Sequence, residues 1–433
     1  MLKGFMSAFR TPDLRRKLLF TLAMIGLYRF GVAIPTPGVS YRNVEMCAAT
    51  ATGANNAFQI LNLFSGGALL QLSIFALGIM PYITASIVVQ LLRVLVPRFE
   101  TLYKEGPEGQ AKLTQYTRYI TVGFAALQAA SYITLARNGV FFPGCSLEIV
   151  PDSSWYVLAM MVLTMTAGTV FIMWMGERIT ERGVGNGMSL LIFTSVAASF
   201  PAAAATIWRS SDGPRNTVFI LLVLLVVIAA VVFVEQSQRR IPVQYAKRMV
   251  GRRMLGGSST YIPLKINMAG VIPVIFASSL LMLPTVITQF AGDNPADWMV
   301  WLQTNLANPA SPWHIGLYIL LIVFFAYFYT AITFNPNDVA DNMKKYGGFI
   351  PGIRPGQPTA DYLDYVLSRI TAAGSLYLAI VALVPTIVFV SMGLSASIPF
   401  GGASILILVG VGLDTVKRIQ SQLEQRHYEG FLK

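Results

Sequence analysis

The sequence predicts an all-α membrane protein with ten transmembrane helices in two inverted five-helix halves around a central pore. Apolar residues make up 55% of the chain and charged residues only 12%. That leaves too little polar surface to cover a soluble protein of 433 residues. The basic residues are also unevenly placed: 25 of the 32 Lys and Arg fall in every second gap between apolar segments, and four fall in the alternate gaps. This is the charge pattern of a multispanning membrane protein.

The apolar segments are each long enough to cross a hydrocarbon core of about 30 Å. They lie near residues 17–36, 74–96, 116–137, 154–176, 186–208, 217–234, 268–290, 314–334, 373–393 and 398–417. Basic residues close to a span resist crossing the bilayer, so the gaps rich in Lys and Arg are expected on the cytoplasmic side. Both ends of the chain are basic, which predicts that both termini are cytoplasmic and that the number of spans is even.

Five spans before the middle of the chain and five after it predict one membrane domain made of two halves, residues 1–212 and 213–433. An odd number of spans inverts the second half relative to the first, as in an inverted repeat with a pathway between its halves. Sequence identity between the halves is not evident. The second half contains two large cytoplasmic loops, residues 235–267 and 335–371.

These two loops are the candidate docking surfaces. The first has seven basic residues, and its QRRIPVQYAKRM stretch alternates in a way that suits a short β-hairpin. In the second, GGFIPGIRPGQPT predicts a series of turns with Arg354 at a tip. Charge alone leaves two alternatives open for each loop, a docking site for a cytosolic partner or a solvated topology signal. Because the basic residues flank spans, nucleic acid is discounted as a substrate.

The spans lack the groups that ion coupling or catalysis needs. Spans 3 to 10 have no Asp, Glu, His, Lys or Arg in their centres, although such residues usually mark ion or proton pathways. Arg29 and Arg93 lie toward opposite ends of the first two spans and can reach a polar boundary by snorkelling. No cluster has metal-ligand spacing, and no Ser, His and Asp set shares a depth. We therefore expect no enzyme activity, no metal and no cofactor.

Three spans combine helix-softening residues with bulky aliphatic ones, in the strings GIMPYI, GVGNGMSLLI and AGVIPVI. An interrupted helix is tolerated in a membrane mainly where it lines a cavity. Ile79 and Ile83 are four residues apart, as are Met188 and Ile192, so each pair projects from one face of its helix. Two such faces could close a pore by dewetting, although ordinary helix packing gives the same pairs.

The segment before the second span, residues 62–73, predicts a short half-helix. Its sequence NLFSGGALLQLS is rich in glycine and carries polar residues. Asn62 or Ser65 could cap it. Gly66 and Gly67 each lower its helix stability by about 1 kcal/mol relative to alanine, so the segment could move.

The chain has two cysteines, Cys47 and Cys145. Both lie in gaps assigned to the outer side of the membrane, where oxidation is possible. Pairing between them is a hypothesis, and an unchanged gel mobility on reduction would remove it.

Six long strings stand out in the sequence: FSGGALLQLSIFALGIMPYITASIVVQLL, ITERGVGNGMS, QRRIPVQYAKRM, GRRMLGGSSTYIPLKINMAGVIPVIFASS, FNPNDVADNMKK and FIPGIRPG. Together they resemble the SecY family, the channel subunits of the bacterial protein-translocation complex, and the resemblance covers essentially the whole chain. It implies a passive, protein-conducting channel in the bacterial cytoplasmic membrane. Such a channel passes unfolded, signal-bearing polypeptides and releases transmembrane segments sideways into lipid.

The resemblance also implies roles for particular residues. The pore ring would be Ile79, Ile83, Met188, Ile192, Ile275 and Ile407, with Met188 in place of the commoner isoleucine. The plug would be Phe64, Ser65, Gly66, Gly67, Ala68, Leu69, Leu70, Gln71, Leu72 and Ser73. The lateral gate would separate Thr84 and Gln90 from Asn267 and Leu283, and a buried polar pair there could latch the closed state. Partner binding would fall to Arg239, Arg240, Arg252, Arg253 and Arg354.

The partners implied by the resemblance are the SecE and SecG subunits, the motor ATPase SecA, the ribosome, signal peptides, unfolded precursor proteins and membrane lipid. Energy should come from the motor or the ribosome, because the chain has no Gly-x-x-x-x-Gly-Lys-Ser/Thr phosphate-binding sequence. Without the family strings, a secondary transporter of small solutes fits the ten spans and inverted halves best. An intramembrane enzyme is a third class, but the spans supply no suitable residue set.

Overall fold

The computed structural model of the chain describes residues 11–50, 62, 65–139, 141–142, 145, 147–152, 154–208, 213–245, 248–250, 253–255, 259–289, 297–306, 311–391 and 402–431. The chain divides into two compact units. The first unit comprises Met1–Thr217, Leu394–Phe400 and Val411–Lys433, and the second comprises Val218–Gly393 and Gly401–Gly410.

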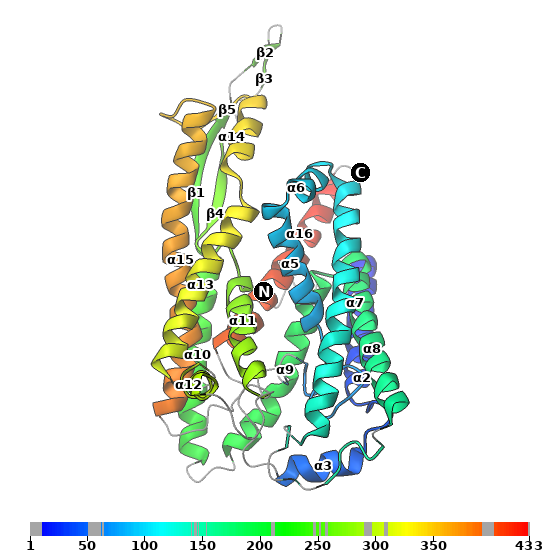
Figure 1. Cartoon of the computed structure of the whole chain (residues 1–433). Coiled ribbons are helices and arrows are strands. Elements are labelled where there is room, and N and C mark those ends of the chain that lie inside the picture. Colours follow the sequence, from blue (N-terminus) through cyan, green and yellow to red (C-terminus); the bar gives the residue numbers. More distant parts are fainter. Residues whose placement is uncertain are drawn as a thin grey trace. The chain divides into compact units, whose positions relative to one another are not determined.

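The first unit is a bundle of helices (Figure 1). It contains α2 (Pro12–Val32), α3 (Tyr41–Thr50), α5 (Met80–Leu95), α6 (Pro97–Lys104), α7 (Pro107–Arg137), α8 (Trp155–Arg182), α9 (Gly187–Trp208) and the later part of α16 (Gly402–Phe431). Helix α7 packs against α5 and α8, and α8 packs against α2 and α9. Figure 1 shows α3 beyond one end of α7 and α6 beyond the other.

The chain bends by 100° between α5 and α6. Val96, which separates the two helices, has extended backbone angles. This conformation is expected for the residue before a proline, and Pro97 begins α6 because proline fits the first turn of a helix. The helix of the second predicted span therefore ends at Leu95, and only Val96 separates it from the short helix α6.

The second unit combines long helices with a small sheet. It contains most of α10 (Gly213–Gln236), β1 (Gln238–Tyr245), β2 (Arg248–Val250), β3 (Arg253–Leu255), β4 (Ser259–Lys265), α11 (Ile272–Gln289), α12 (Asp297–Asn305), α13 (Pro312–Thr333), α14 (Pro336–Lys345), β5 (Gly348–Phe349) and α15 (Gln357–Ser391). Helix α13 packs against α11 and α15. The sheet lies beside α14 and the start of α15, at one end of α13 (Figure 1).

The predicted hairpin is partly wrong: its first strand is present, but its partner strand lies outside the predicted stretch. Strand β1 pairs antiparallel with β4, from Gln238 opposite Lys265 to Gln244 opposite Ser259, and β5 adds to its other edge. Strands β2 and β3 form a separate antiparallel pair between them. The alternation seen in QRRIPVQYAKRM is that of β1, whose Ile241 and Val243 are buried. Its partner strand lies further along the chain than the predicted hairpin reached.

The prediction of a helical membrane protein is confirmed, with the short strands outside the predicted spans. A helix lies at each of the ten predicted positions. Within the described residues, five helices are long and apolar enough to cross a membrane, or six if α5 and α6 form one bent span. Two shorter apolar helices, Gly187–Pro201 and Ile272–Leu281, lie at predicted spans 5 and 7. The count of ten crossings is consistent with these helices and stays a prediction.

Candidate functional site

Of the segment predicted as a half-helix, residues 62–73, Asn62 is helical, whereas residues 65–73 begin a series of turns that continues to residue 79, and α5 begins only at Met80. Gly66, Gly67 and Leu72 have φ angles of 69°, 95° and 45°. These left-handed angles interrupt an α-helix, and glycine adopts them without the steric penalty that other residues meet. Residues 65–73, the described part of the predicted plug, are called the turn segment below, and they do not form a regular helix.

Both predicted capping residues do satisfy backbone groups of the turn segment. The Leu70 N–H donates to Asn62 Oδ1 at 3.1 Å, and the Leu69 N–H donates to Ser65 Oγ at 3.0 Å. Phe64, the first residue of the predicted plug, lies outside the described residues. The side chains at 62 and 65 thus stabilise the turns in place of a helix N-terminus.

The start of the turn segment is fastened to α2 by two polar side chains, one of which also contacts Ser195 of α9. The Tyr28 hydroxyl donates to the Ser65 carbonyl oxygen at 3.2 Å and lies 2.6 Å from Ser195 Oγ. Arg29 Nη1 donates to the Gly66 carbonyl oxygen at 2.9 Å. Arg29 therefore has a backbone carbonyl of the turn segment as a partner inside the first unit, and its snorkelling to a polar boundary stays a prediction.

The end of the turn segment is fastened by backbone bonds to the residues that follow α2. The Thr36 N–H donates to the Leu72 carbonyl at 2.9 Å, and the Ile74 N–H donates to the Ile34 carbonyl at 3.0 Å. These bonds form an isolated antiparallel bridge between Pro35 and Ser73. The segment is thus held at both ends by the same neighbouring part of the chain.

The residues predicted to form the pore ring lie where the sequence placed them. Ile79 and Ile83 are at the start of α5, Met188 and Ile192 on α9, Ile275 on α11 and Ile407 on α16. Four are buried, and Ile83 and Met188 are half-buried. The Met188 sulfur packs against Gly176 of α8, where a β-carbon would collide with it. Because the six residues are divided between the two units, the ring itself stays a prediction.

The polar residues of the predicted lateral gate have hydrogen-bond partners in their own units. Thr84 Oγ1 donates to the Met80 carbonyl at 3.0 Å, and Gln90 Nε2 donates to Ser86 Oγ at 3.4 Å. Asn267 is buried, and its Nδ2 donates to Glu235 Oε1 at 2.6 Å and to the Gly270 carbonyl at 3.0 Å. Leu283 lies in α11, and its side chain is outside the described ones.

Two of the predicted partner-binding arginines are exposed on β1. They are Arg239 and Arg240, and the Arg240 guanidinium lies 4.8 Å from the centre of the Tyr261 ring on the partner strand. Arg253 begins β3, and its side chain is not among those described. Arg252 lies outside the described residues.

Arg354 is exposed in the turn between β5 and α15, as predicted. Gly352 and Gly356, on either side of it, have φ angles of 84° and 102°, and the Thr359 hydroxyl donates to the Arg354 carbonyl at 2.8 Å. Strands β1, β4 and β5, helix α14 and the beginning of α15, together called the arm, share a buried apolar cluster: Ile241, Val243, Leu264, Met343, Ile350, Leu363 and Val366. The turn that carries Arg354 is therefore built on a packed core.

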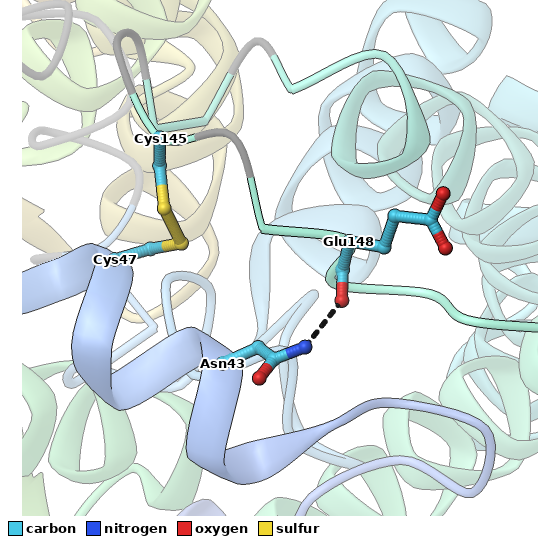
Figure 2. The surroundings of a disulfide bond; sticks show 4 residues. All are labelled: Asn43, Cys47, Cys145 and Glu148. Carbon is cyan, nitrogen blue, oxygen red and sulfur yellow. Dashed lines mark hydrogen bonds between the residues drawn. A yellow bond between two sulfur atoms is a disulfide. The ribbon is translucent and has the colours of Figure 1, made fainter.

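The hypothesis that the two cysteines pair is confirmed. Cys47 of α3 and Cys145 form a disulfide between residues 98 apart in sequence, with Cα atoms 5.6 Å apart. Figure 2 shows Asn43, one helical turn before Cys47, donating to the Glu148 carbonyl at 2.7 Å. The disulfide and this hydrogen bond join α3 to the chain between α7 and α8.

Sequence reasoning did not single out Tyr28, Ser195 or Glu235. A tyrosine and a serine in an apolar helix suit ordinary packing, and Glu235 stands at the end of a span where acidic residues are common. One feature of the sequence could have pointed to them: each is a polar residue within or beside a predicted span, where a polar group needs a partner. Among the described residues, no group of three or more His, Cys, Asp or Glu could hold a metal ion.

Comparisons with known proteins agree on one family. The sequence matches the SecY family model over residues 73–416. It is 60% identical to the protein translocase subunit SecY of Streptomyces coelicolor over 438 residues, and 57% identical to that of Mycobacterium tuberculosis over 443 residues, covering 100% of each pair of chains.

Solved structures show the same fold. A structure described as that of a protein conducting channel superposes with a TM-score of 0.65 at 16% identity, covering 94% of this chain and 91% of the other. Sec61 in the canine ribosome-channel complex gives a TM-score of 0.62 at 16% identity, with the same coverage.

Proposed function

The chain belongs to the SecY family of protein translocase subunits and is a protein-conducting channel, and we propose that it passes unfolded, signal-bearing polypeptides across the bacterial cytoplasmic membrane. It is a multi-pass membrane protein and a channel subunit, not an enzyme. The full-length identity to translocase subunits carries this conclusion. The alternative, a secondary transporter of small solutes, has no support.

Within this function, we propose that the aliphatic ring seals the resting channel. A constriction of Ile79, Ile83, Met188, Ile192, Ile275 and Ile407 would exclude water and ions without a specific ligand, which suits a cargo of varied chemistry. Replacing Ile79, Ile83 and Ile275 with serine should raise the resting ion conductance. An unchanged conductance would mean that these residues only pack their helices.

The turn segment is the proposed plug, and α5 and α11 are the proposed walls of a lateral gate that releases transmembrane segments into lipid. In this proposal Thr84 and Gln90 line one wall, and Asn267 and Leu283 line the other. The bond from Asn267, just before α11, to Glu235 at the end of α10 gives the second wall a fixed polar group. Signal peptides would enter at this gate.

We further propose that the arm docks a cytosolic motor ATPase of the SecA type or the ribosome, with both termini on the same side. The support is the exposed arginines of β1 and the Arg354 turn, all carried by a packed core. A rigid, cationic surface limits the ordering that binding requires, and arginine is a common anchor of protein interfaces. Arg252 and Arg253 would extend this surface. SecE and SecG are the proposed membrane partners.

The test is reconstitution with SecE into lipid vesicles, adding SecA, ATP and an unfolded signal-bearing precursor, and measuring protease-protected precursor. Arg354→Glu should reduce protection by at least about 30-fold, the factor that the loss of an interface hot spot of 2 kcal/mol or more produces. Arg369→Glu is the matched control, because Arg369 is exposed in the same predicted loop but lies on α15 beyond the turn.

Normal protection with Arg354→Glu, or an equal loss with Arg369→Glu, would refute the specific role of the Arg354 turn. Absence of any protection by the unmodified channel, with SecA still bound, would instead refute motor-driven polypeptide transport.

A further inference from the structure

We propose that Tyr28, Arg29 and Ser195 form a latch that holds the start of the turn segment in its resting position and sets how readily the channel opens. The inference rests on the proposed function, since it takes the turn segment as the plug. All of its contacts lie within the first unit. Tyr28 and Arg29 come from α2 and donate to the carbonyl oxygens of Ser65 and Gly66. Ser195 comes from α9, and its Oγ lies 2.6 Å from the Tyr28 hydroxyl.

The hydroxyl pair gives the latch a contact that can break. Tyr28 is only 1% exposed, so its proton needs an acceptor. Its hydroxyl has two neighbours, the Ser65 carbonyl at 3.2 Å and Ser195 Oγ at 2.6 Å, and Ser195 Oγ is also 3.0 Å from the Leu191 carbonyl. Each hydroxyl carries one proton. With the turn segment in place, Tyr28 donates to Ser65 and Ser195 donates to one of its own two neighbours.

When the turn segment leaves, these two protons still have acceptors. Tyr28 then donates to Ser195 Oγ, and Ser195 donates to the Leu191 carbonyl, 3.0 Å away in its own helix. An unpaired buried donor is what normally makes a buried hydrogen bond expensive to break. Because no hydroxyl proton is left unpaired, the bond to Ser65 is releasable.

Arg29 supplies the stronger contact of the latch. Its guanidinium donates to the Gly66 carbonyl at 2.9 Å, and a bond from a charged donor is roughly twice as strong as one between neutral groups. A cationic side chain within a span is costly when it has no partner. Arg29 therefore favours the state in which the turn segment is in place, and it sets the threshold that an incoming polypeptide has to overcome.

The close approach at Gly66 shows that the turn segment is fitted to these side chains. A β-carbon on Gly66 would lie 3.1 Å from Arg29 Nη1 and 3.2 Å from Ser195 Cα. Gly67 has a similar left-handed backbone, yet a β-carbon there would meet no atom of the described residues within 4 Å. An alanine would thus have a strained backbone at both positions, but only at Gly66 would its β-carbon crowd Arg29 and Ser195.

Among the described residues, the other end of the turn segment is held by backbone bonds to its neighbours, and no side chain from another element donates to it as Tyr28 and Arg29 do. Leu72 and Ile74 are held through backbone bonds to Thr36 and Ile34, which form a short antiparallel bridge. The contrast assigns the two ends different roles: the bridge is the fixed end, and residues 65–67 are the end that the latch releases.

The test measures resting chloride flux through vesicles that contain the channel with SecE and no motor. Arg29→Met and Gly66→Ala should each raise the flux by about tenfold, the change in an equilibrium constant expected from losing one charge-assisted hydrogen bond. Gly67→Ala has the same backbone strain but no collision with Arg29 and Ser195, so the chloride flux of this variant should be much lower than that of Gly66→Ala. Arg29→Lys keeps a charged donor and should restore most of the seal.

Thermal unfolding of each detergent-solubilised complex separates a latch from a purely structural role. Variants that lower the unfolding temperature but hold chloride as tightly as the unmodified channel would overturn the proposal, as would equal fluxes for the two glycine variants. If Gly66→Ala does not fold, the comparison of Arg29→Met with Arg29→Lys decides. ATP-dependent precursor protection by the unmodified channel is measured in parallel, and its absence would refute the proposed function without changing the flux comparison.

Discussion

Two regions outside the predicted spans are held in place by different means. The arm of the second unit has a three-stranded sheet over a buried apolar cluster and contains no cysteine. The outer cap, defined as α3 with the described residues between 141 and 152, has no strand among those residues. Within it, the loop is joined to α3 by the disulfide and by the bond from Asn43 to Glu148, and to Ser40, just before α3, by the Ser40 N–H donating to the Ile149 carbonyl at 3.0 Å.

The difference follows from the length of chain and the chemistry available to each region. The arm draws on two long loops, enough to form a backbone ladder and bury seven apolar residues, and this requires no oxidant. The cap is a ten-residue helix and a loop, for which a covalent bond replaces a ladder. The cap is predicted to lie on the outer side of the membrane, where disulfides persist. A polar substitution should therefore damage the arm, whereas reduction should loosen the cap.

The largest expected effect is that of Leu264→Asp in the arm. Leu264 is 0% exposed within the apolar cluster, so the change removes a core side chain and buries a carboxyl group. We expect a loss of about 3–5 kcal/mol of local stability. Limited proteolysis should then cleave β1 and β4, and motor-driven transport should fail.

Thr260→Asp is the matched control for the arm, because Thr260 lies on the same strand with its side chain exposed. It should leave proteolysis and transport unchanged. Equal sensitivity of the two variants would mean that the strand, and not its buried face, sets the stability of the arm.

Removal of the disulfide by Cys47→Ser should have the next largest effect. The bond links residues 98 apart in sequence, and a disulfide typically contributes about 2–4 kcal/mol, mainly by restricting the unfolded chain. The unfolding temperature of the solubilised complex should fall to that of the reduced protein. Added reductant should shift the unmodified protein and leave Cys47→Ser unchanged. A variant as stable as the oxidised protein would show that hydrogen bonds and packing are enough to hold the cap.

The sequence predicted those parts of the fold that depend on local pattern. Hydropathy and charge located the helices, the glycine-rich turn placed Arg354 at the surface, and alternation found β1. The partner strand β4 was missed because the intervening residues 246–258 show no comparable alternation. Pairing of the cysteines followed from their assignment to one side of the membrane and from there being only two.

The contacts of the turn segment could not be predicted in the same way. The bond from Arg29 to Gly66 joins residues 37 apart, and that from Asn267 to Glu235 joins residues 32 apart. Such partners are brought together by packing of whole helices, which leaves no periodic trace in the sequence. Leu72 shows the same limit, because its left-handed backbone is disfavoured locally and is held by the bridge to the residues after α2.

The smallest expected effect, that of Asn43→Ala, tests whether the disulfide or the hydrogen bonds define the cap. The bond to the Glu148 carbonyl is exposed, so water replaces the lost donor, and the oxidised protein should lose only about 0.5 kcal/mol. In Cys47→Ser, the same bond is one of the few remaining links between α3 and the loop. Its loss should then cost at least about 0.5 kcal/mol more than in the oxidised protein, a non-additivity typical of residues that share one contact.

Asn305→Ala is the control for this cycle, because Asn305 lies on α12 of the second unit and makes a similarly exposed hydrogen bond, donating to the Trp301 carbonyl at 3.1 Å. Its effect should add to that of Cys47→Ser within about 0.3 kcal/mol. If Asn43→Ala also adds in this way, the hydrogen bond contributes independently of the disulfide. The cap would then be stabilised by several independent contacts, as the arm is. The two regions would differ only in the kind of contact that stabilises them, and not in whether a single contact dominates.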